Sequence, residues 1–107
     1  MRDRLRIGLS SRGSTLRVVT IGDLDFQGSP QLANYVDTVA STFDSPIELD
    51  LRGIRAIDPH GVSLLIRLRR RFRRRLRIIP SEPVARTVHF VARGARNRRN
   101  AATADGA

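Results

Sequence analysis

Apolar and polar residues alternate along several short stretches of the chain. Two of these stretches carry the apolar positions Leu5, Ile7 and Leu9, and Ile47, Leu49 and Leu51. A repeat of two residues is typical of a strand with one buried face and one wetter face. An apolar run over residues 16–21 and a shorter one over residues 76–79 predict two more strands. Residues 10–14 predict a hairpin turn between the first two strands.

In the segments between these strands, apolar residues recur every three or four positions, which is the spacing of a helix with one buried face. The first predicted helix covers residues 30–43. It begins at Ser29-Pro30, because serine can cap free N–H groups and proline suits the first helical turn. It ends at Asp44-Ser45-Pro46. Its predicted buried face consists of Leu32, Tyr35, Val36, Val39, Ala40 and Phe43.

Two further helices are predicted in the second half of the chain. One begins at Pro59, directly after Asp58, whose carboxylate is placed to accept the backbone N–H of His60 or Gly61. Its buried positions are Leu65, Leu68, Phe72 and Leu76. The other begins at Ser81-Glu82-Pro83. It has Val84, Val88 and Val91 facing inward and Gly94 as its stop.

The order of these elements predicts an α/β fold. Two strand–helix–strand crossovers require parallel strands with right-handed connections, and the leading hairpin adds an antiparallel edge. We therefore expect a mixed four-stranded sheet with about three helices, mainly on one face. Residues 1–92 form the single domain of this prediction. Residues 93–107 lack apolar periodicity and are predicted to be a disordered basic tail.

The net charge of +10 lies almost entirely in the second half of the chain. Residues 1–58 hold 7 Arg and 8 acidic residues, which gives −1, while residues 59–107 hold 13 Arg and 2 acidic residues, which gives +11. All 20 basic residues are Arg, a bias that a GC-rich genome also produces. That explanation weakens any argument for nucleic-acid binding that rests on the arginines.

Polar residues follow two of the predicted strands at the edge where ligands of parallel sheets bind. These strand exits are Gly22–Asp25 and Ala56–Gly61. They are predicted to bring Asp23, Asp25, Asp58 and His60 into one neighbourhood around the start of the second long helix. The simpler interpretation, favoured for each residue alone, is that Asp58 is a helix cap and that Asp23 and Asp25 are turn residues.

Three short motifs resemble those of a known family. They are Gly22-Asp23-Leu24-Asp25, the strand Glu48–Ile54, and Ile57-Asp58-Pro59-His60-Gly61-Val62. Together they resemble the STAS domain of bacterial anti-sigma factor antagonists, over about residues 5–92. The resemblance implies a binding protein whose partner is an anti-sigma factor that is also a serine kinase. It also implies partner-binding residues, which are Asp23, Asp25, Asp58, Pro59, His60, Gly61, Val62 and Ser63.

The chain departs from that family at the phosphorylated serine. The matching position, immediately before Gly61, is His60, and the residue before it is Pro59. Neither residue has a hydroxyl group, so the usual kinase reaction cannot occur there. Three interpretations follow: constitutive binding, a changed partner, or phosphorylation of Ser63 instead, which we disfavour because Ser63 lies on the helix itself. His60 is interpreted first as an exposed loop residue, ahead of a pH-sensitive contact, a phosphohistidine or a metal ligand.

The second long helix carries the densest charge. Residues 67–77 contain 8 Arg and no acid. Like charges four residues apart cost a few tenths of a kcal/mol per pair, or about 1–2 kcal/mol in sum, which a folded helix tolerates. We favour a solvated face, or one paired with Glu48, Asp50 or the first helix. The alternative is an anion-binding surface, made of Arg67, Arg70, Arg71, Arg74 and Arg75, that binds nucleic acid nonspecifically or an acidic protein.

Known catalytic patterns do not match this chain. There is no cysteine, and a phosphoacceptor receiver domain would need a lysine, which the sequence lacks. We expect a non-enzyme without cofactor or metal. No segment reads as a signal peptide or a membrane span, which favours a cytoplasmic protein without membrane insertion. An accessory subunit of an ABC transporter and a nucleic-acid-binding protein are the alternative functions, and a homodimer is left open.

Overall fold

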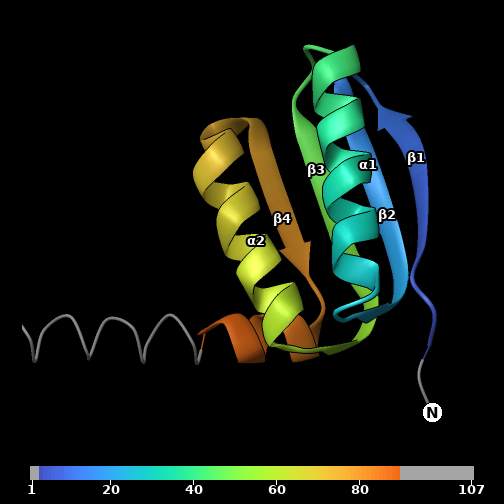
Figure 1. Cartoon of the computed structure of the whole chain (residues 1–107). Coiled ribbons are helices and arrows are strands. Elements are labelled where there is room, and N and C mark those ends of the chain that lie inside the picture. Colours follow the sequence, from blue (N-terminus) through green and yellow to red (C-terminus); the bar gives the residue numbers. More distant parts are fainter. Residues whose placement is uncertain (1–2, 90–107) are drawn as a thin grey trace, which may run out of the picture.

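The computed structural model describes residues 3–89. Four strands form one mixed sheet in the order β1-β2-β3-β4 (Figure 1). They are β1 (Arg6–Arg12), β2 (Thr15–Leu24), β3 (Ile47–Ile57) and β4 (Leu76–Pro80). β1 and β2 are antiparallel, whereas β2, β3 and β4 run parallel. The predicted mixed sheet with an antiparallel leading hairpin is confirmed.

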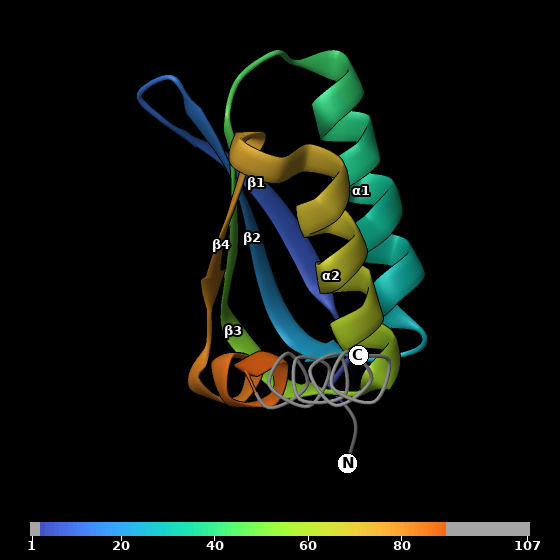
Figure 2. The ribbon, with the colours of Figure 1, turned by 90° about the vertical axis from the view of Figure 1, so that its left-hand side faces the viewer.

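The two long helices cover the same face of the sheet (Figure 2). They are α1 (Gly28–Thr42) and α2 (Pro59–Phe72), and each connects two parallel strands. A 3-10 turn, η1 (Arg73–Arg75), joins α2 to β4. Residues 82–89 are helical and lie at the end of the sheet where the parallel strands finish (Figures 1 and 2). The helices therefore lie mainly on one face, as predicted.

The third helix begins where the sequence places it. The Ser81 hydroxyl accepts the N–H of Val84 at 3.4 Å, and the Val84 side chain is buried. The predicted inward Val91, the stop at Gly94 and the predicted tail lie outside the described residues. Within residues 3–89 no helix combines the length and apolar character that crossing a bilayer requires.

The core lies between the sheet and the two long helices. Its most deeply buried side chains include Val18, Ile47, Leu49 and Leu51 from the strands and Leu32, Val36, Leu64, Leu65 and Leu68 from the helices. Burial of each such side chain contributes about 1.5–3 kcal/mol. The prediction that Phe43 belongs to this core is wrong. α1 ends at Thr42, and Phe43 follows in an extended conformation that leaves it 42% exposed.

Strand β2 continues three residues beyond its predicted end at Ile21. Gly22 has a φ of 115°, which favours glycine because side chains strain this conformation. The pairing with β3 shifts register immediately after Gly22, and Asp23 and Leu24 then resume it. Within the predicted exit Gly22–Asp25, only Asp25 lies outside the strand, because the glycine allows an irregularity within it. The chain leaves β2 at Asp25.

Charged side chains form a network on the face of the sheet that faces away from the helices. Arg17 lies opposite Glu48 in the register, and its Nε donates to Glu48 Oε1 at 2.8 Å. Arg52 Nη2 donates to Asp50 Oδ2 at 2.8 Å, and Arg52 Nε to Asp50 Oδ1 at 3.0 Å. Of the alternatives predicted for the arginines of residues 67–77, pairing with Glu48 or Asp50 therefore does not occur. Alternation along β3 turns both carboxylates to the opposite face from the helices.

Acidification should weaken the fold partly through Asp50. The Arg52 guanidinium hydrogen-bonded to it lowers the pKa of the Asp50 carboxyl below 3.8, although partial burial acts in the opposite direction. A depressed folded pKa gives stability that is present above the unfolded pKa and lost as pH falls through the folded one. Urea unfolding below about pH 4 should therefore show a smaller pH-dependent loss in Asp50→Asn than in the wild type. Equal losses in the two proteins would contradict this role of Asp50.

Candidate functional site

The candidate site lies where β2 and β3 end and α1 and α2 begin, at one end of the molecule (Figure 1). Both strands are parallel, so their carboxyl ends meet at the same edge. The backbone N–H of Asp58, just after β3, donates to the carbonyl of Leu24 at 3.2 Å. The end of β2 with the turn that follows it (residues 22–25) and the start of α2 (residues 58–63), which we call the two site loops, are therefore brought side by side, as predicted.

Asp58 connects these two loops. Its Oδ1 accepts the backbone N–H of Gly61 at 3.0 Å, which caps α2 as predicted. Its Oδ2 accepts the backbone N–H of Phe26 at 2.9 Å, from the loop before α1. One carboxylate thus fixes the start of α2 and its distance from the start of α1. The sequence predicted the first of these contacts but not the second.

Asp25 stabilises the start of α1. Its Oδ1 accepts the N–H groups of Gln27 at 3.1 Å and Gly28 at 2.8 Å, and its carbonyl accepts the N–H of Ser29. The prediction that Ser29 caps this helix is wrong. Because Asp25 already binds the first free N–H groups, α1 begins at Gly28 and Ser29 lies within its first turn. The Ser29 hydroxyl is buried without a hydrogen-bond partner in the described part of the chain.

Asp23 holds the N-terminal segment. Its Oδ2 accepts the N–H of Asp3 at 2.9 Å, and its own N–H donates to the Asp3 carbonyl at 2.9 Å. The three carboxylates at this end of the sheet therefore bind backbone N–H groups of three different segments. Among residues 3–89 no group of three His, Asp or Glu side chains is arranged to hold a metal ion.

Pro59 and His60 are the exposed part of the loop that opens α2. The His60 side chain is 69% exposed, and its Nδ1 lies 3.5 Å from Asp58 Oδ2. Its ring lies 6.2 Å, centroid to centroid, from the ring of Phe26 in the neighbouring loop. The next two residues, Gly61 and Val62, are buried and belong to the packing of α2, while Ser63 is exposed again. A partner that touches this loop would meet Pro59, His60 and Ser63.

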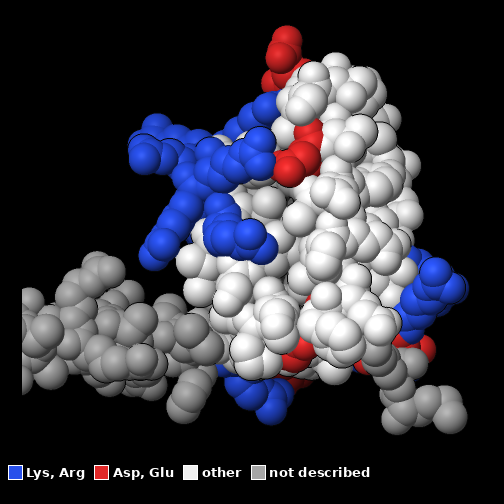
Figure 3. All heavy atoms as spheres, in the orientation of Figure 1, with Lys and Arg blue, Asp and Glu red and all other residues white. Residues whose placement is uncertain are grey.

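A groove runs between the first halves of α1 and α2. Its lining consists of Phe26, Ser29, Pro30, Ala33, Asn34, Pro59, His60, Ser63 and Arg67. Most of these side chains are uncharged, and the space-filling view shows a largely uncharged lower front surface (Figure 3). The contribution of α1 was missed by the sequence analysis. The signal available was Phe26, a large apolar residue in a polar turn, which is 55% exposed.

The arginines predicted as an anion-binding surface have different environments. Arg71 Nη1 binds Asp37 Oδ1 of α1 at 2.6 Å, which confirms pairing with the first helix. Arg75 donates to the carbonyls of Ser45 and Phe43 and so holds the loop after α1. Arg67 lines the groove. Arg70 and Arg74 are exposed and pair with no carboxylate of the described residues.

The fold is that of a small α/β domain, and the candidate site lies at the starts of its two neighbouring long helices. A comparison with protein families agrees with this class. Residues 7–96 match the family model described as "Mlab, STAS domain". The chain therefore belongs to this family of STAS domains, and the resemblance seen in its motifs is confirmed at that level. No curated protein matches the chain.

Proposed function

We propose that the protein is a non-enzymatic binding protein of the cytoplasm that acts as an anti-sigma factor antagonist without the serine phosphorylation switch. Its partner would be an anti-sigma factor of the serine-kinase type or a related regulator. The observation that carries this proposal is the exposed Pro59-His60 turn beside the uncharged groove. Family membership supports a STAS-type binding role, and the loops of this site are the ones that the family resemblance implicates.

The missing hydroxyl determines how such a switch would behave. A phosphate in this turn would add roughly two negative charges at the start of α2, close to the Asp58 carboxylate. Pro59 and His60 cannot carry a phosphoserine, and the contacts of Asp58 hold the turn in one conformation. The groove would thus stay open to its partner regardless of kinase activity. We therefore propose constitutive binding, regulated by the amount of protein.

The groove provides an aromatic anchor for a partner. Phe26 is the largest exposed apolar side chain that lines it, and exposed aromatic residues at the centre of an interface often dominate the binding energy. Phe43 is a matched reference, because it is 42% exposed but lies beyond α1, outside the groove. The two phenylalanines permit the same substitution at and away from the proposed interface.

The test begins with affinity purification from the native cell and identification of the copurifying protein. Phe26→Ala should then weaken binding to that purified partner by about 30-fold, the effect of a hot-spot residue, whereas Phe43→Ala should change it little. If the partner is a kinase, incubation with ATP should leave residues 58–63 without phosphate, as measured by mass spectrometry. His60→Ser should restore phosphorylation.

Three other results would contradict parts of this proposal. An ABC-type ATPase as the copurifying protein would favour an accessory subunit of a transporter. If Phe26→Ala and Phe43→Ala weakened partner binding equally, the interface would not be centred on the groove. A phosphopeptide covering residues 58–63 of the wild-type protein would contradict the loss of the switch.

A further inference from the structure

A second surface lies at the opposite end of α2 from the groove. It is formed by five exposed arginines of α2, η1 and β4, which we call the arginine cluster: Arg69, Arg70, Arg73, Arg74 and Arg77. No carboxylate of the described residues pairs with any of them. The space-filling view shows arginine side chains projecting over the last part of α2 (Figure 3). The end of α2 therefore presents concentrated positive charge that forms no ion pair with a carboxylate of residues 3–89.

The cluster surrounds a hollow. Arg69, Arg73, Arg74 and Arg77 line it, together with the apolar side chains of Leu76 and Ile78. Positive side chains that line one hollow repel one another, and an anion between them would offset this repulsion. Each guanidinium can also bind two oxygens of a phosphate group at once, which an ammonium group cannot do. The hollow is thus suited to phosphate groups.

The backbone within the cluster is strained. Arg73 ends α2 with a φ of 48° and a ψ of −122°, a conformation that residues other than glycine rarely adopt. It is the single non-glycine residue with positive φ among residues 3–89. Glycine would remove the strain at this position but would also remove one charge from the hollow. Backbone strain at a charged residue is consistent with a function for its side chain.

The arrangement of the arginines favours a duplex nucleic acid over a flat anionic surface. The cluster extends around the edge of the sheet: Arg69 and Arg70 belong to α2 on one face, whereas Arg77 of β4 lies opposite Glu48 in the register and therefore on the other face. A plane would contact only part of such a curved array at a time. The phosphates on both sides of a groove in a duplex could contact all of it, and a duplex carries one charge per about 1.7 Å of its axis.

The surroundings also argue against a membrane and against single strands. Among residues 3–89 the exposed large hydrophobic residues are Leu9, Ile21, Phe26 and Phe43, and none of them belongs to the cluster or lines its hollow. The cluster therefore has no side chain to insert among lipids. The aromatic residue nearest in sequence, Phe72, is half-buried and is covered by the Arg71 guanidinium 5.0 Å from its ring centroid. Stacking of unpaired bases, which single-strand binding uses, has no platform here.

We propose that the arginine cluster binds the phosphodiester backbone of duplex nucleic acid, without sequence preference. This surface is separate from the groove, which lies at the start of α2, so the two can act independently. The cluster consists of arginines alone, and we expect their contacts with phosphates, which carry no sequence information, to dominate over contacts with base edges. Binding should therefore be strongly dependent on salt.

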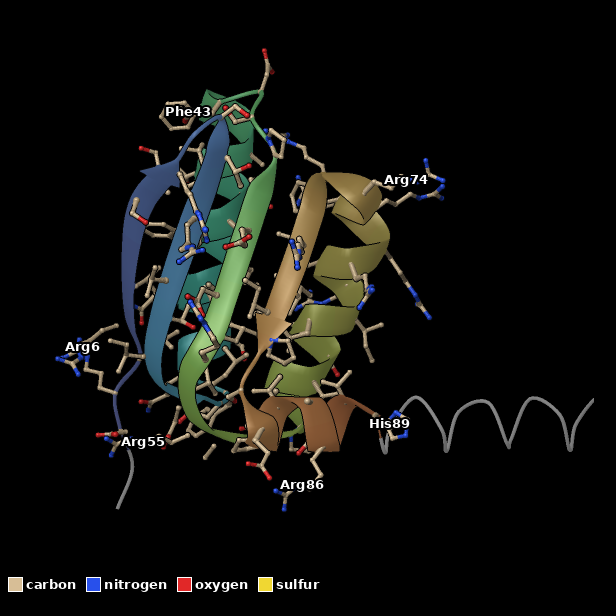
Figure 4. The ribbon with its side chains drawn as sticks, turned by 180° about the vertical axis from the view of Figure 1, so that it is seen from behind. Arg6, Phe43, Arg55, Arg74, Arg86 and His89 are labelled. Atoms are coloured by element: carbon tan, nitrogen blue, oxygen red, sulfur yellow. The ribbon has the colours of Figure 1, made fainter. Side chains whose placement is uncertain are left out.

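The test compares two triple variants of the full chain that lose the same charge. One is Arg70→Gln/Arg74→Gln/Arg77→Gln in the cluster. The other is Arg4→Gln/Arg6→Gln/Arg12→Gln, at and before the edge strand β1. Figure 4 shows Arg74 and Arg6 at opposite sides of the molecule, pointing away from each other. All six arginines are exposed, and none pairs with a carboxylate of the described residues.

Fluorescence anisotropy with a labelled 20-base-pair duplex, titrated at several salt concentrations, provides the measurement. We expect the cluster variant to bind at least about tenfold more weakly, with a salt slope reduced by roughly three, and the β1 variant to bind nearly as the wild type does. Equal losses in the two variants would overturn the proposal, because net charge alone would then explain binding. Stronger binding to vesicles of anionic phospholipid than to the duplex would overturn it as well.

Discussion

Gly61→Ala should destabilise the protein by about 3 kcal/mol, the upper end of what overpacking of a well-packed site costs. A Cβ atom at this position would lie 2.8 Å from Ile57 Cγ1 and 3.0 Å from Leu24 Cγ, and it would overlap the Leu24 carbonyl oxygen. That oxygen cannot move away freely, because it accepts the N–H of Asp58. The only relief is a displacement of the start of α2 away from the sheet.

Thermal unfolding followed by circular dichroism would measure this effect. For a domain of this size a loss of 3 kcal/mol corresponds to a decrease in Tm of roughly 12–24 °C. Gly8→Ala is the matched control, since a Cβ on Gly8 in the edge strand β1 would have no atom within 4 Å. Its Tm should stay within a few degrees of the wild type. A Gly61→Ala protein as stable as Gly8→Ala would mean that α2 does not pack this closely on β2.

The requirement for glycine at position 61 shows where sequence patterns stop being informative. The order of strands and helices follows from local periodicity, and so does the cap that Asp58 provides for α2. The contact between Gly61 and the Leu24 carbonyl depends instead on how α2 packs across two strands. Residues 37 positions apart in sequence meet there, and no local pattern reveals their distance.

The start of α1 and its capping residue were predicted wrongly because two residues were equally suited to cap the helix. Both Asp25 and Ser29 are residue types that cap helices, and the sequence favoured Ser29 because a proline follows it. In the structure Asp25 receives the free N–H groups, since the irregularity at Gly22 carries β2 on to Leu24 and the turn follows directly. The earlier start of α1 brings Phe26 beside Asp58 and His60, and so creates the groove that the sequence did not predict.

The pairing of the arginines depends on which face of the sheet each acid occupies. Composition correctly places the charge in the second half of the chain, and Asp37 of α1 does bind Arg71. Glu48 and Asp50 instead bind Arg17 and Arg52 on the far face, an outcome fixed by the register between β2 and β3. Two of the three acids considered as partners for α2 are therefore used elsewhere. The arginine cluster thus forms no ion pair within the part of the chain that the structure describes.

Asp58→Ala should lower the free energy of unfolding by about 2–4 kcal/mol. A helix cap contributes about 0.5–2 kcal/mol, and a hydrogen bond to a charged group contributes about 1.5–3 kcal/mol. The variant loses both, because the carboxylate binds the N–H of Gly61 with one oxygen and that of Phe26 with the other. The expected loss of unfolding free energy is large for one partly exposed side chain. Removing the carboxylate uncaps α2 and also breaks the bond that holds the loop of Phe26 beside it.

Asp58→Asn separates these two roles. Asparagine keeps one side-chain oxygen, which can still cap α2 at Gly61, but its amide group cannot accept the N–H of Phe26. We therefore expect a stability between those of the wild type and Asp58→Ala in urea unfolding. Binding to the copurified partner should nevertheless fall nearly as far as in Asp58→Ala, because both variants release the loop that carries Phe26.

The control for charge is Asp44→Asn, at an exposed position in the loop after α1. It should leave both stability and partner binding close to those of the wild type. If Asp58→Asn binds the partner as well as this control does, the bond to Phe26 does not shape the interface, and Asp58 serves only to cap α2. If its binding is lost while the helix cap is kept, the distance between the two loops is what the partner recognises.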